Sequence, residues 1–203
     1  DLAVVCYVNS TAEIKAVSDV CVTSSNAVKV VSNIPQKNIF FVPDNNLGRY
    51  VAEKLPEKHF IFHDGFCHVH KSIHAAELQA AKDACPEALV LTHPECTSDV
   101  VAMSDFVGST SEIIDFATQS DCKKFIICTE MGVFFELQQK NPDKKFYSVG
   151  HRQFCPNMKK VTIDKVEQVL EKLGSGELEE IKLSDEILTR AAKPLQRMLE
   201  LAK

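Results

Sequence analysis

The chain has 203 residues and a formal net charge of −5, with 45% hydrophobic and 25% charged residues. These are ordinary globular values, and a chain of this length can bury one large core or two small ones. The negative charge counts against nucleic acid as the main partner. Because no apolar run approaches the ~20 residues needed to cross a bilayer and no leader opens the chain, we expect a cytoplasmic protein without a membrane partner.

The eight cysteines favour buried, catalytic or metal-binding thiols over disulfides, because the chain is long and core-rich. No CxxC pair is present, which disfavours a zinc ribbon or finger. Asp1 runs directly into a strand-like segment, so a truncated chain is expected. Six thiols are expected to be small core residues, namely Cys6, Cys21, Cys85, Cys96, Cys122 and Cys128.

Short apolar runs alternate with helix-like segments as far as about residue 154. The expected strands are 3–7, 20–23, 39–42, 59–62, 89–92, 106–107, 125–128 and 145–148. The expected helices are 11–18, 27–31, 47–55, 71–84, 97–103, 110–117 and 131–139. This alternation predicts an α/β fold of three-layer α-β-α domains, with short parallel sheets and right-handed crossovers.

The order of elements occurs twice, at an offset of 86 residues that places Asp44 on Glu130. The offset becomes 88 between Cys67 and Cys155, which therefore stand at equivalent ends of two units. The expected division is an α/β unit at 1–68, a second at 69–154, and a strand-free tail at 155–203 with helices at 161–173 and 184–201. The tail is expected to pack across both units.

Polar side chains follow several expected strands, where the carboxyl ends of parallel strands and the amino ends of helices gather ligands. The candidates are Tyr7, Asn9, Ser24, Ser109 and Thr110. Their hydroxyl groups and the free N–H groups of the helices could bind carboxylates or a phosphate. The alternative is that the hydroxyl residues are ordinary helix caps.

His93 and Glu95 stand two residues apart at a strand exit. An imidazole and a carboxylate at this spacing could carry out general acid–base chemistry, or they could be a polar strand end and a solvated first-turn residue. His70, in the run 68–70 beside Cys67, has the same two interpretations. If that run is extended, only one of its faces can meet a site.

Cys67 and Cys155 are interpreted as two ligands of one iron–sulfur cluster. Three or four thiolates usually hold a 4Fe-4S cluster. A third unit with its own cysteine, preceding Asp1, would complete the set and leave one iron open for substrate. The expected arrangement is therefore pseudo-threefold with one domain missing.

Seven motifs are informative together and occur in one order along the chain: Tyr7-Val8-Asn9-Ser10-Thr11, Thr23-Ser24-Ser25-Asn26-Ala27-Val28, Pro43-Asp44-Asn45-Asn46-Leu47-Gly48, Cys67-His68-Val69-His70, His93-Pro94-Glu95-Cys96, Val107-Gly108-Ser109-Thr110 and Cys155-Pro156-Asn157-Met158. With them the chain resembles the quinolinate synthase (quinolinate synthetase A) family over nearly its whole length. Members of that family are built from three similar α/β domains, each giving one cysteine to a 4Fe-4S cluster.

The resemblance implies an iron–sulfur-dependent transferase of NAD biosynthesis. It would condense iminoaspartate with dihydroxyacetone phosphate to give quinolinate, with loss of phosphate and water. L-aspartate oxidase or aspartate dehydrogenase is the implied source of iminoaspartate. Because the family's N-terminal domain and its cysteine are absent, the chain alone is expected to bind the cluster poorly and to be inactive.

The resemblance also implies roles for individual residues. Cys67 and Cys155 would hold the cluster, which acts as a Lewis acid. Glu95 would be the acid–base residue, assisted by His93 and His70, and these residues would also touch substrate. The carboxylates and the phosphate end of the triose would be held by Tyr7, Asn9, Ser24, Ser109 and Thr110, with Tyr7 also a catalytic candidate.

Two other functions remain open on the residues alone. One is a non-catalytic α/β module that binds anions at its Ser/Thr helix ends, with Cys67 and Cys155 merely structural. The other is a zinc hydrolase using His70, His93 and Glu95. Iron and sulfide analysis separates the first from a cluster enzyme, and stoichiometric zinc that survives chelation would favour the second.

Overall fold

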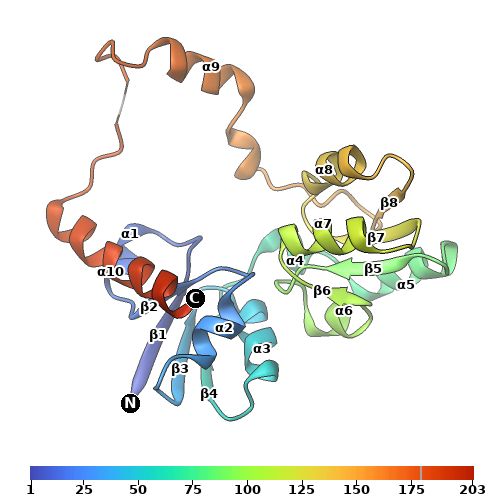
Figure 1. Cartoon of the computed structure of the whole chain (residues 1–203), viewed down its shortest axis with the longest axis horizontal. Coiled ribbons are helices and arrows are strands. Elements are labelled where there is room, and N and C mark those ends of the chain that lie inside the picture. The colour runs from blue at the N-terminus through green and yellow to red at the C-terminus, as the bar shows by residue number, and fades with distance from the viewer. Residues whose placement is uncertain (179) are drawn as a thin grey trace.

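A computed structural model describes residues 1–178 and 180–203, so residue 179, inside the expected tail, lies outside the described residues. The described chain holds two four-stranded parallel sheets, in the orders β2-β1-β3-β4 and β6-β5-β7-β8 (Figure 1). The strands are β1 Leu2–Tyr7, β2 Val20–Val22, β3 Asn38–Val42, β4 His59–Phe62, β5 Leu89–Thr92, β6 Phe106–Val107, β7 Lys124–Cys128 and β8 Lys145–Ser148. The expected α/β fold of short parallel sheets is confirmed.

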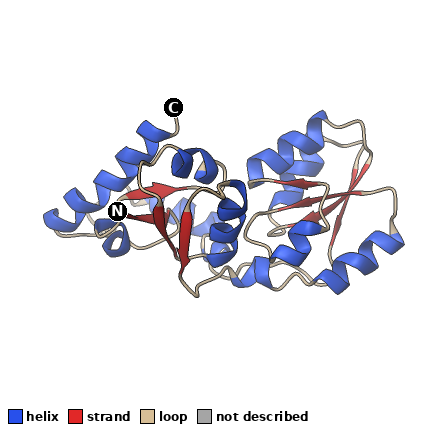
Figure 2. Cartoon of the chain, turned by 90° about the horizontal axis from the view of Figure 1, so that it is seen from below, coloured by secondary structure: helices blue, strands red, loops and turns tan. Residues whose placement is uncertain are grey.

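Helices flank both sheets, as the view from below shows (Figure 2). They are α1 Ala12–Ala16, α2 Ala27–Ser32, α3 Asn45–Lys54, α4 His68–Lys71, α5 Ala75–Ala84, α6 Ser98–Ala102, α7 Thr110–Gln119 and α8 Val133–Lys140. The helix expected at 71–84 begins later than predicted, because α5 starts at Ala75 and residues 72–74 separate it from α4. The run 68–70 is accordingly helical rather than extended, and it buries His70 while His68 is exposed.

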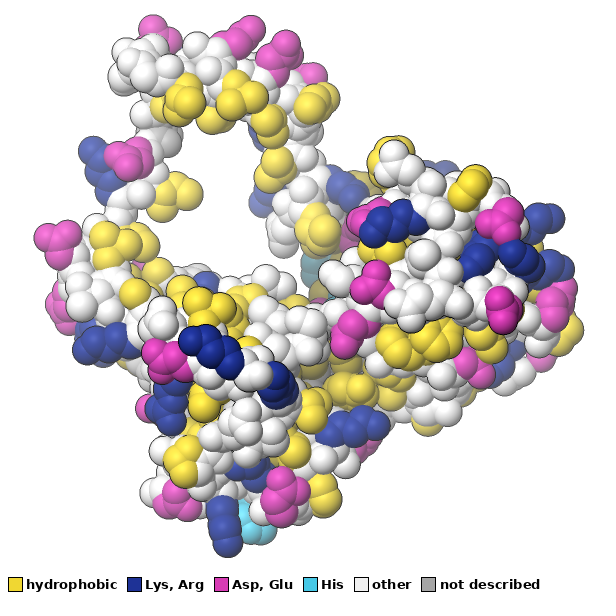
Figure 3. Space-filling view, in the orientation of Figure 1, with side chains coloured by type: hydrophobic (Ala, Val, Ile, Leu, Met, Phe, Trp, Pro, Cys, Tyr) yellow, Lys and Arg dark blue, Asp and Glu magenta, His cyan; other side chains and the backbone are white. Residues whose placement is uncertain are grey.

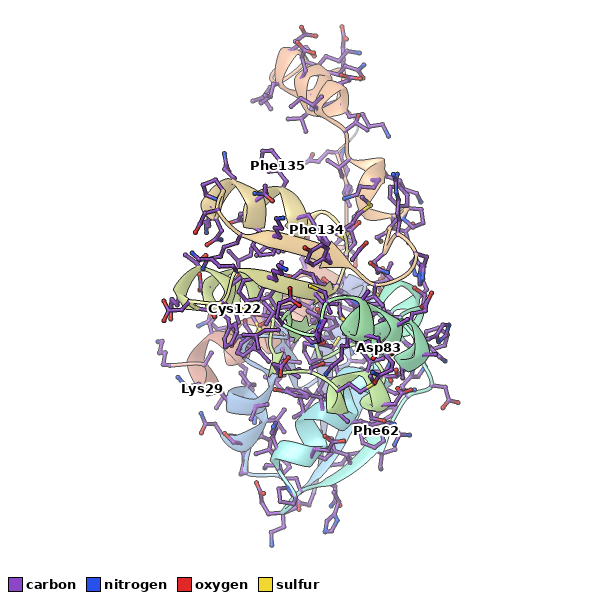
Figure 4. All side chains as sticks on the ribbon, turned by 90° about the vertical axis from the view of Figure 1, so that its right-hand side faces the viewer. Lys29, Phe62, Asp83, Cys122, Phe134 and Phe135 are labelled. Atoms are coloured by element: carbon purple, nitrogen blue, oxygen red, sulfur yellow. The ribbon has the colours of Figure 1, made fainter. Side chains whose placement is uncertain are left out.

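Both faces of the second sheet are covered, which explains why its strands read as continuous apolar runs. Val90 and Ile126 belong to one buried cluster, whereas the next residues, Leu91 and Ile127, belong to another. Neighbouring residues on a strand point to opposite faces, so the two clusters lie on opposite sides of the sheet. On α8, Phe134 packs against the second of these clusters, while Phe135 is 75% exposed (Figure 4).

The internal repeat is present in hydrogen bonds as well as in strand order. The Val4 N–H donates to the Asp19 carboxylate at 2.7 Å, and the Val90 N–H donates to the Asp105 carboxylate at 2.8 Å. Both aspartates also return their own N–H to the carbonyl of the same valine. An aspartate thus fixes the start of the second strand of each sheet in the same way.

Two lysines cap helix ends at equivalent positions of the repeat. Lys144 is buried, and its Nζ donates to the carbonyls of Ala117 and Ser120 at 2.6 and 2.7 Å, at the end of α7. Lys58 donates to the carbonyl of Ile34 at 2.7 Å, just after α2. A cation there satisfies carbonyls that have no partner within the helix and complements the helix dipole.

Replacing Lys144 by Met is expected to lower the free energy of unfolding by about 1.5–3 kcal/mol, because hydrogen bonds to a charged group are lost and the carbonyls stay buried. Urea denaturation of the 203-residue chain measures this. Lys145→Met is the matched control, since Lys145 is exposed on β8, and it should change the free energy by less than about 0.5 kcal/mol. Equal losses for the two variants would contradict the capping role.

The tail leaves the second unit after Cys155 and returns to the first (Figure 1). It forms a 3₁₀ turn at Met158–Lys160, α9 at Ile163–Glu171 and α10 at Asp185–Leu201. None of the α9 residues is buried, and Figure 3 shows hydrophobic side chains on the side of α9 that faces the rest of the chain. In contrast, α10 packs against α1 and β2 and places Met198 in the first core. The described tail therefore packs on the first unit through α10, and near its start Lys159 contacts Glu130 of the second unit.

Candidate functional site

Cys67 lies in the loop after β4 and immediately precedes α4. Its backbone N–H donates to Oδ2 of Asp44 at 2.7 Å. Asp44 follows β3, is only 3% exposed, and also accepts the Leu47 N–H at 2.8 Å as the N-cap of α3. One buried carboxylate thus ties the start of a helix to the backbone of the cysteine.

Cys155 is held in the same way in the second unit. Its N–H donates to Oε1 of Glu130 at 3.2 Å, and Glu130 also accepts the Gly132 N–H at 2.6 Å. Lys159 lies 3.2 Å from the same carboxylate. Glu130 stands 86 residues after Asp44, so equivalent carboxylates hold the two cysteine loops.

The acid–base candidates meet in one buried cluster. Nδ1 of His93 lies 3.2 Å from Oε2 of Glu95, and Nδ1 of His70 lies 3.4 Å from the same oxygen. The two imidazole rings stack at 4.4 Å between centroids with an interplanar angle of 16°. Nε2 of His70 is 2.9 Å from Oγ1 of Thr129. His70, His93 and Glu95 are all less than a tenth exposed.

Burial sets the protonation of this cluster. It raises the pKa of Glu95 to about 8, and the neighbouring Asp44 carboxylate adds to the rise. Burial lowers the pKa of His70 to about 4 and holds the pKa of His93 well below its usual range. At neutral pH the imidazoles are therefore neutral and Glu95 is mostly protonated. A protonated carboxyl beside a neutral imidazole can donate a proton to a bound reactant.

Tyr7, at the end of β1, belongs to the same neighbourhood. Burial raises the pKa of its hydroxyl, the Glu95 carboxylate raises it further, and the Ser24 hydroxyl acts in the opposite sense. Ser24 is half-buried and does not cap α2, whereas Asn9 is exposed in the loop after β1. The Tyr7 phenol thus stays protonated and available to donate a hydrogen bond.

Ser109 and Thr110 lie at the start of α7. The Ser109 hydroxyl donates to Oε2 of Glu112 at 2.6 Å, and the Ser109 N–H donates to the same oxygen at 2.7 Å. This is a capping box, so the ordinary-cap interpretation accounts for the contacts of Ser109. Thr110 is exposed in the first turn.

The site joins the two units. The Asn46 side chain, at the start of α3, donates to the carbonyl of Glu95 at 3.1 Å. Asp44 of the first unit is also among the groups that raise the pKa of Glu95 in the second. Asp44, Asn46, Thr129 and Glu130 were not among the candidates drawn from the sequence. The repeat offset that superposes Asp44 on Glu130 was the available signal.

The cysteines fit the role of metal ligands. Cys67 and Cys155 are free and half-buried, and their loops are held through backbone N–H groups, which leaves both sulfurs available. Burial raises the pKa of the Cys67 thiol, and a bound cation would favour its thiolate. Among the other cysteines, Cys6, Cys21, Cys96 and Cys128 are buried as expected, whereas Cys85 and Cys122 are half-buried.

A single ion could be held by a different trio. Cys67, His70 and Glu95 each offer one ligand atom, and these atoms lie within 4.8 Å of one another. The zinc-hydrolase interpretation named His70, His93 and Glu95 as ligands, whereas the observed trio has Cys67 in the place of His93. The His93 Nδ1 accepts the Glu95 N–H at 3.3 Å, so that nitrogen already has a partner.

None of the described helices is long and apolar enough to cross a membrane.

Comparison with known proteins gives a consistent result over the whole chain. The family model for quinolinate synthetase A protein matches residues 1–200. The quinolinate synthase of Caldicellulosiruptor saccharolyticus is 50% identical over 202 residues, which is 100% of this chain and 65% of that protein. The quinolinate synthase of Clostridioides difficile is 46% identical over 200 residues, 98% of this chain and 64% of that protein. The chain thus spans just under two thirds of the length of these relatives.

Proposed function

The chain belongs to the quinolinate synthetase A protein family, and we propose that it forms about two thirds of a quinolinate synthase. The observation that carries the proposal is the equivalence of Cys67 and Cys155, whose N–H groups are bound by the repeat-related carboxylates Asp44 and Glu130. In this proposal 1–68 and 69–154 are two of the enzyme's α/β units, and 155–203 is the tail that starts at a ligand cysteine.

The proposed reaction condenses iminoaspartate with dihydroxyacetone phosphate to quinolinate, in the cytoplasmic synthesis of NAD. L-aspartate oxidase or aspartate dehydrogenase would supply the iminoaspartate. Forming a pyridine ring from these reactants requires several proton transfers and the loss of water and phosphate. A buried acid–base cluster suits such a series of reaction steps, because it keeps water away from the reacting atoms.

Glu95 is proposed to move protons to and from the reactant. Its raised pKa supports this role, because a carboxyl with a pKa of about 8 exchanges protons readily near neutral pH. The Nδ1 atom of His93 lies 3.2 Å from the Glu95 carboxyl and would orient it, while Nδ1 of His70 lies 3.4 Å from the same oxygen. Tyr7 would donate a hydrogen bond to a reactant oxygen, supported by its protonated state.

Four further residues are proposed to hold the charged ends of the reactants. Ser24 lies near Tyr7 and would bind a carboxylate together with Asn9. Ser109 and Thr110 stand at the amino end of α7, where free N–H groups would bind the phosphate of the triose. Ser109 would have to exchange its contact with Glu112 for the ligand.

A 4Fe-4S cluster is proposed as the resident cofactor, with Cys67 and Cys155 as two ligands and a third cysteine outside this chain. When bound, the cluster supplies a Lewis acid for reactant oxygen or nitrogen. The residues of this chain that would keep its ligands in place are Asp44 and Glu130.

The test compares this chain with the full-length protein after anaerobic reconstitution with iron and sulfide. The full-length protein is expected to show the visible absorption of a 4Fe-4S cluster and to form quinolinate, while the chain alone gives no stable cluster and no product. Quinolinate is measured by chromatography, and iron and sulfide by chemical analysis. A stable cluster with turnover in the chain alone would overturn its incompleteness. A full-length protein with no iron, no sulfide and no product would instead favour the anion-binding module.

A further inference from the structure

One ring nitrogen of His70 lacks a hydrogen-bond partner although it is buried. The side chain is 9% exposed, and Nδ1 makes no hydrogen bond with any described residue. The other nitrogen, Nε2, is paired with Oγ1 of Thr129 at 2.9 Å. Buried polar atoms nearly always have a partner, so an unpaired nitrogen in a native fold requires an explanation. A metal ion is one ligand that a neutral imidazole nitrogen can bind.

Two further metal-ligating groups lie beside this nitrogen. The Cys67 sulfur and a Glu95 carboxylate oxygen are within 4.8 Å of each other and of a His70 ring nitrogen. Cys67 is the N-cap residue of α4, and His70 lies in the single turn of that helix, three residues later. Glu95 arrives from the loop after β5 in the second unit. Three donors therefore converge from two segments.

We propose that Cys67, His70 and Glu95 form a binding site for one thiophilic divalent cation such as Zn²⁺. The donor set of one thiolate, one imidazole and one carboxylate suits zinc, whereas Mg²⁺ and Ca²⁺ prefer oxygen ligands alone. A thiolate, a carboxylate and a neutral imidazole also balance the charge of a divalent ion. Water would complete a tetrahedral coordination, since the half-buried Cys67 leaves an opening to solvent.

The geometry needs only a small adjustment to accept the ion. Zinc–ligand distances of about 2.0–2.3 Å place tetrahedral ligand atoms roughly 3.3–3.8 Å apart. The present separations of up to 4.8 Å therefore have to shorten by about 1 Å, which side-chain rotation at Cys67 and Glu95 can supply. Thr129 would orient the imidazole through Nε2, as hydrogen-bond partners of metal-bound histidines commonly do.

This site has a consequence for the proposed cofactor. The cation and a 4Fe-4S cluster would both require the sulfur of Cys67, so they cannot bind at the same time. A zinc-loaded protein would also have Glu95 and His70 occupied. Zinc would therefore block both cluster assembly and acid–base chemistry. The binding of zinc to the trio does not itself depend on whether the protein forms quinolinate.

Cobalt titration of the reduced, metal-free 203-residue chain tests the site directly. Co²⁺ is expected to bind at one equivalent and to give a thiolate-to-cobalt charge-transfer band with the visible bands of tetrahedral cobalt. Zn²⁺ should displace it. Cys67→Ser should abolish the charge-transfer band, and His70→Ala and Glu95→Gln should weaken binding. Thr129→Val should keep the spectrum but weaken affinity about 10–100-fold.

Cys155→Ser is the matched control, because Cys155 is a proposed cluster ligand outside the trio. It should bind cobalt as the parent does, and near-ultraviolet circular dichroism checks that each variant folds. A charge-transfer band that survives in Cys67→Ser, or one that is lost in folded Cys155→Ser, would overturn the site, as would no binding by the parent. None of these results bears on quinolinate formation. In the full-length protein, zinc added first should slow cluster assembly, and an unchanged rate would overturn mutual exclusion.

Discussion

Replacing Glu95 by Gln is expected to lower the rate of quinolinate formation by the full-length protein by about 10²–10⁴-fold, the usual contribution of a general acid or base. Glutamine keeps the size and hydrogen-bonding capacity of the side chain but cannot transfer a proton. The loss should appear in kcat rather than in KM, since the amide still occupies the place of the carboxyl beside His93. Steady-state kinetics on the reconstituted protein measures both constants.

The iron and sulfide content separates loss of acid–base chemistry from loss of the cofactor. The Glu95→Gln protein should contain as much of both as the parent, because Glu95 is not a proposed cluster ligand. Glu87→Gln is the control for a general effect of removing a carboxylate, as Glu87 is on the surface of the same unit beside Lys124. Full activity in Glu95→Gln would refute the assigned role, and a variant that lacks iron would place Glu95 in cofactor binding instead.

Replacing Asp44 by Ala should destabilise the first unit and release the Cys67 loop. The carboxylate accepts the Leu47 N–H at 2.8 Å and the Cys67 N–H at 2.7 Å, and both bonds are lost. The loss of the helix cap and of a hydrogen bond to a charged group together predict a decrease of about 2–4 kcal/mol in the free energy of unfolding. This range allows for the stabilising effect of removing a buried charge. Urea denaturation of the chain measures the decrease.

Thiol labelling tests the local part of this prediction. Cys67 should react faster with a thiol reagent in Asp44→Ala than in the parent, while Cys155 should be unchanged, and mass spectrometry of peptides distinguishes the two. Glu130→Ala provides the reciprocal control, because Glu130 holds Cys155 in the equivalent way. Glu130→Ala should lower the free energy of unfolding by less than Asp44→Ala does, since Glu130 pairs with Lys159, whose side chain is partly exposed to water. Faster labelling of both cysteines in both variants would indicate general loosening rather than two independent anchors.

The surroundings of Cys67 combine a strand set by local sequence with a helix start set by a distant contact. The apolar run at 59–62 predicted β4 with correct bounds, since strand periodicity is a local property. The run 68–70 was considered as an extended segment, whereas it lies in α4, His68–Lys71. The Cys67 N–H that starts this helix is fixed by Asp44, 23 residues earlier. A contact over that distance leaves no periodic signal beside the cysteine.

The order of the strands, the duplication at an offset of 86 residues and the candidate residue types could all be predicted from the amino-acid sequence. These follow from local hydrophobic periodicity and from residue identity. The folded structure was needed to show that His70 and His93 meet at one buried oxygen of Glu95, and that equivalent carboxylates hold Cys67 and Cys155. These contacts join residues far apart in the sequence, so local periodicity carries no sign of them. The protonation of Glu95 also depends on the folded structure, because its pKa is raised by burial and by Asp44, which comes from the first unit.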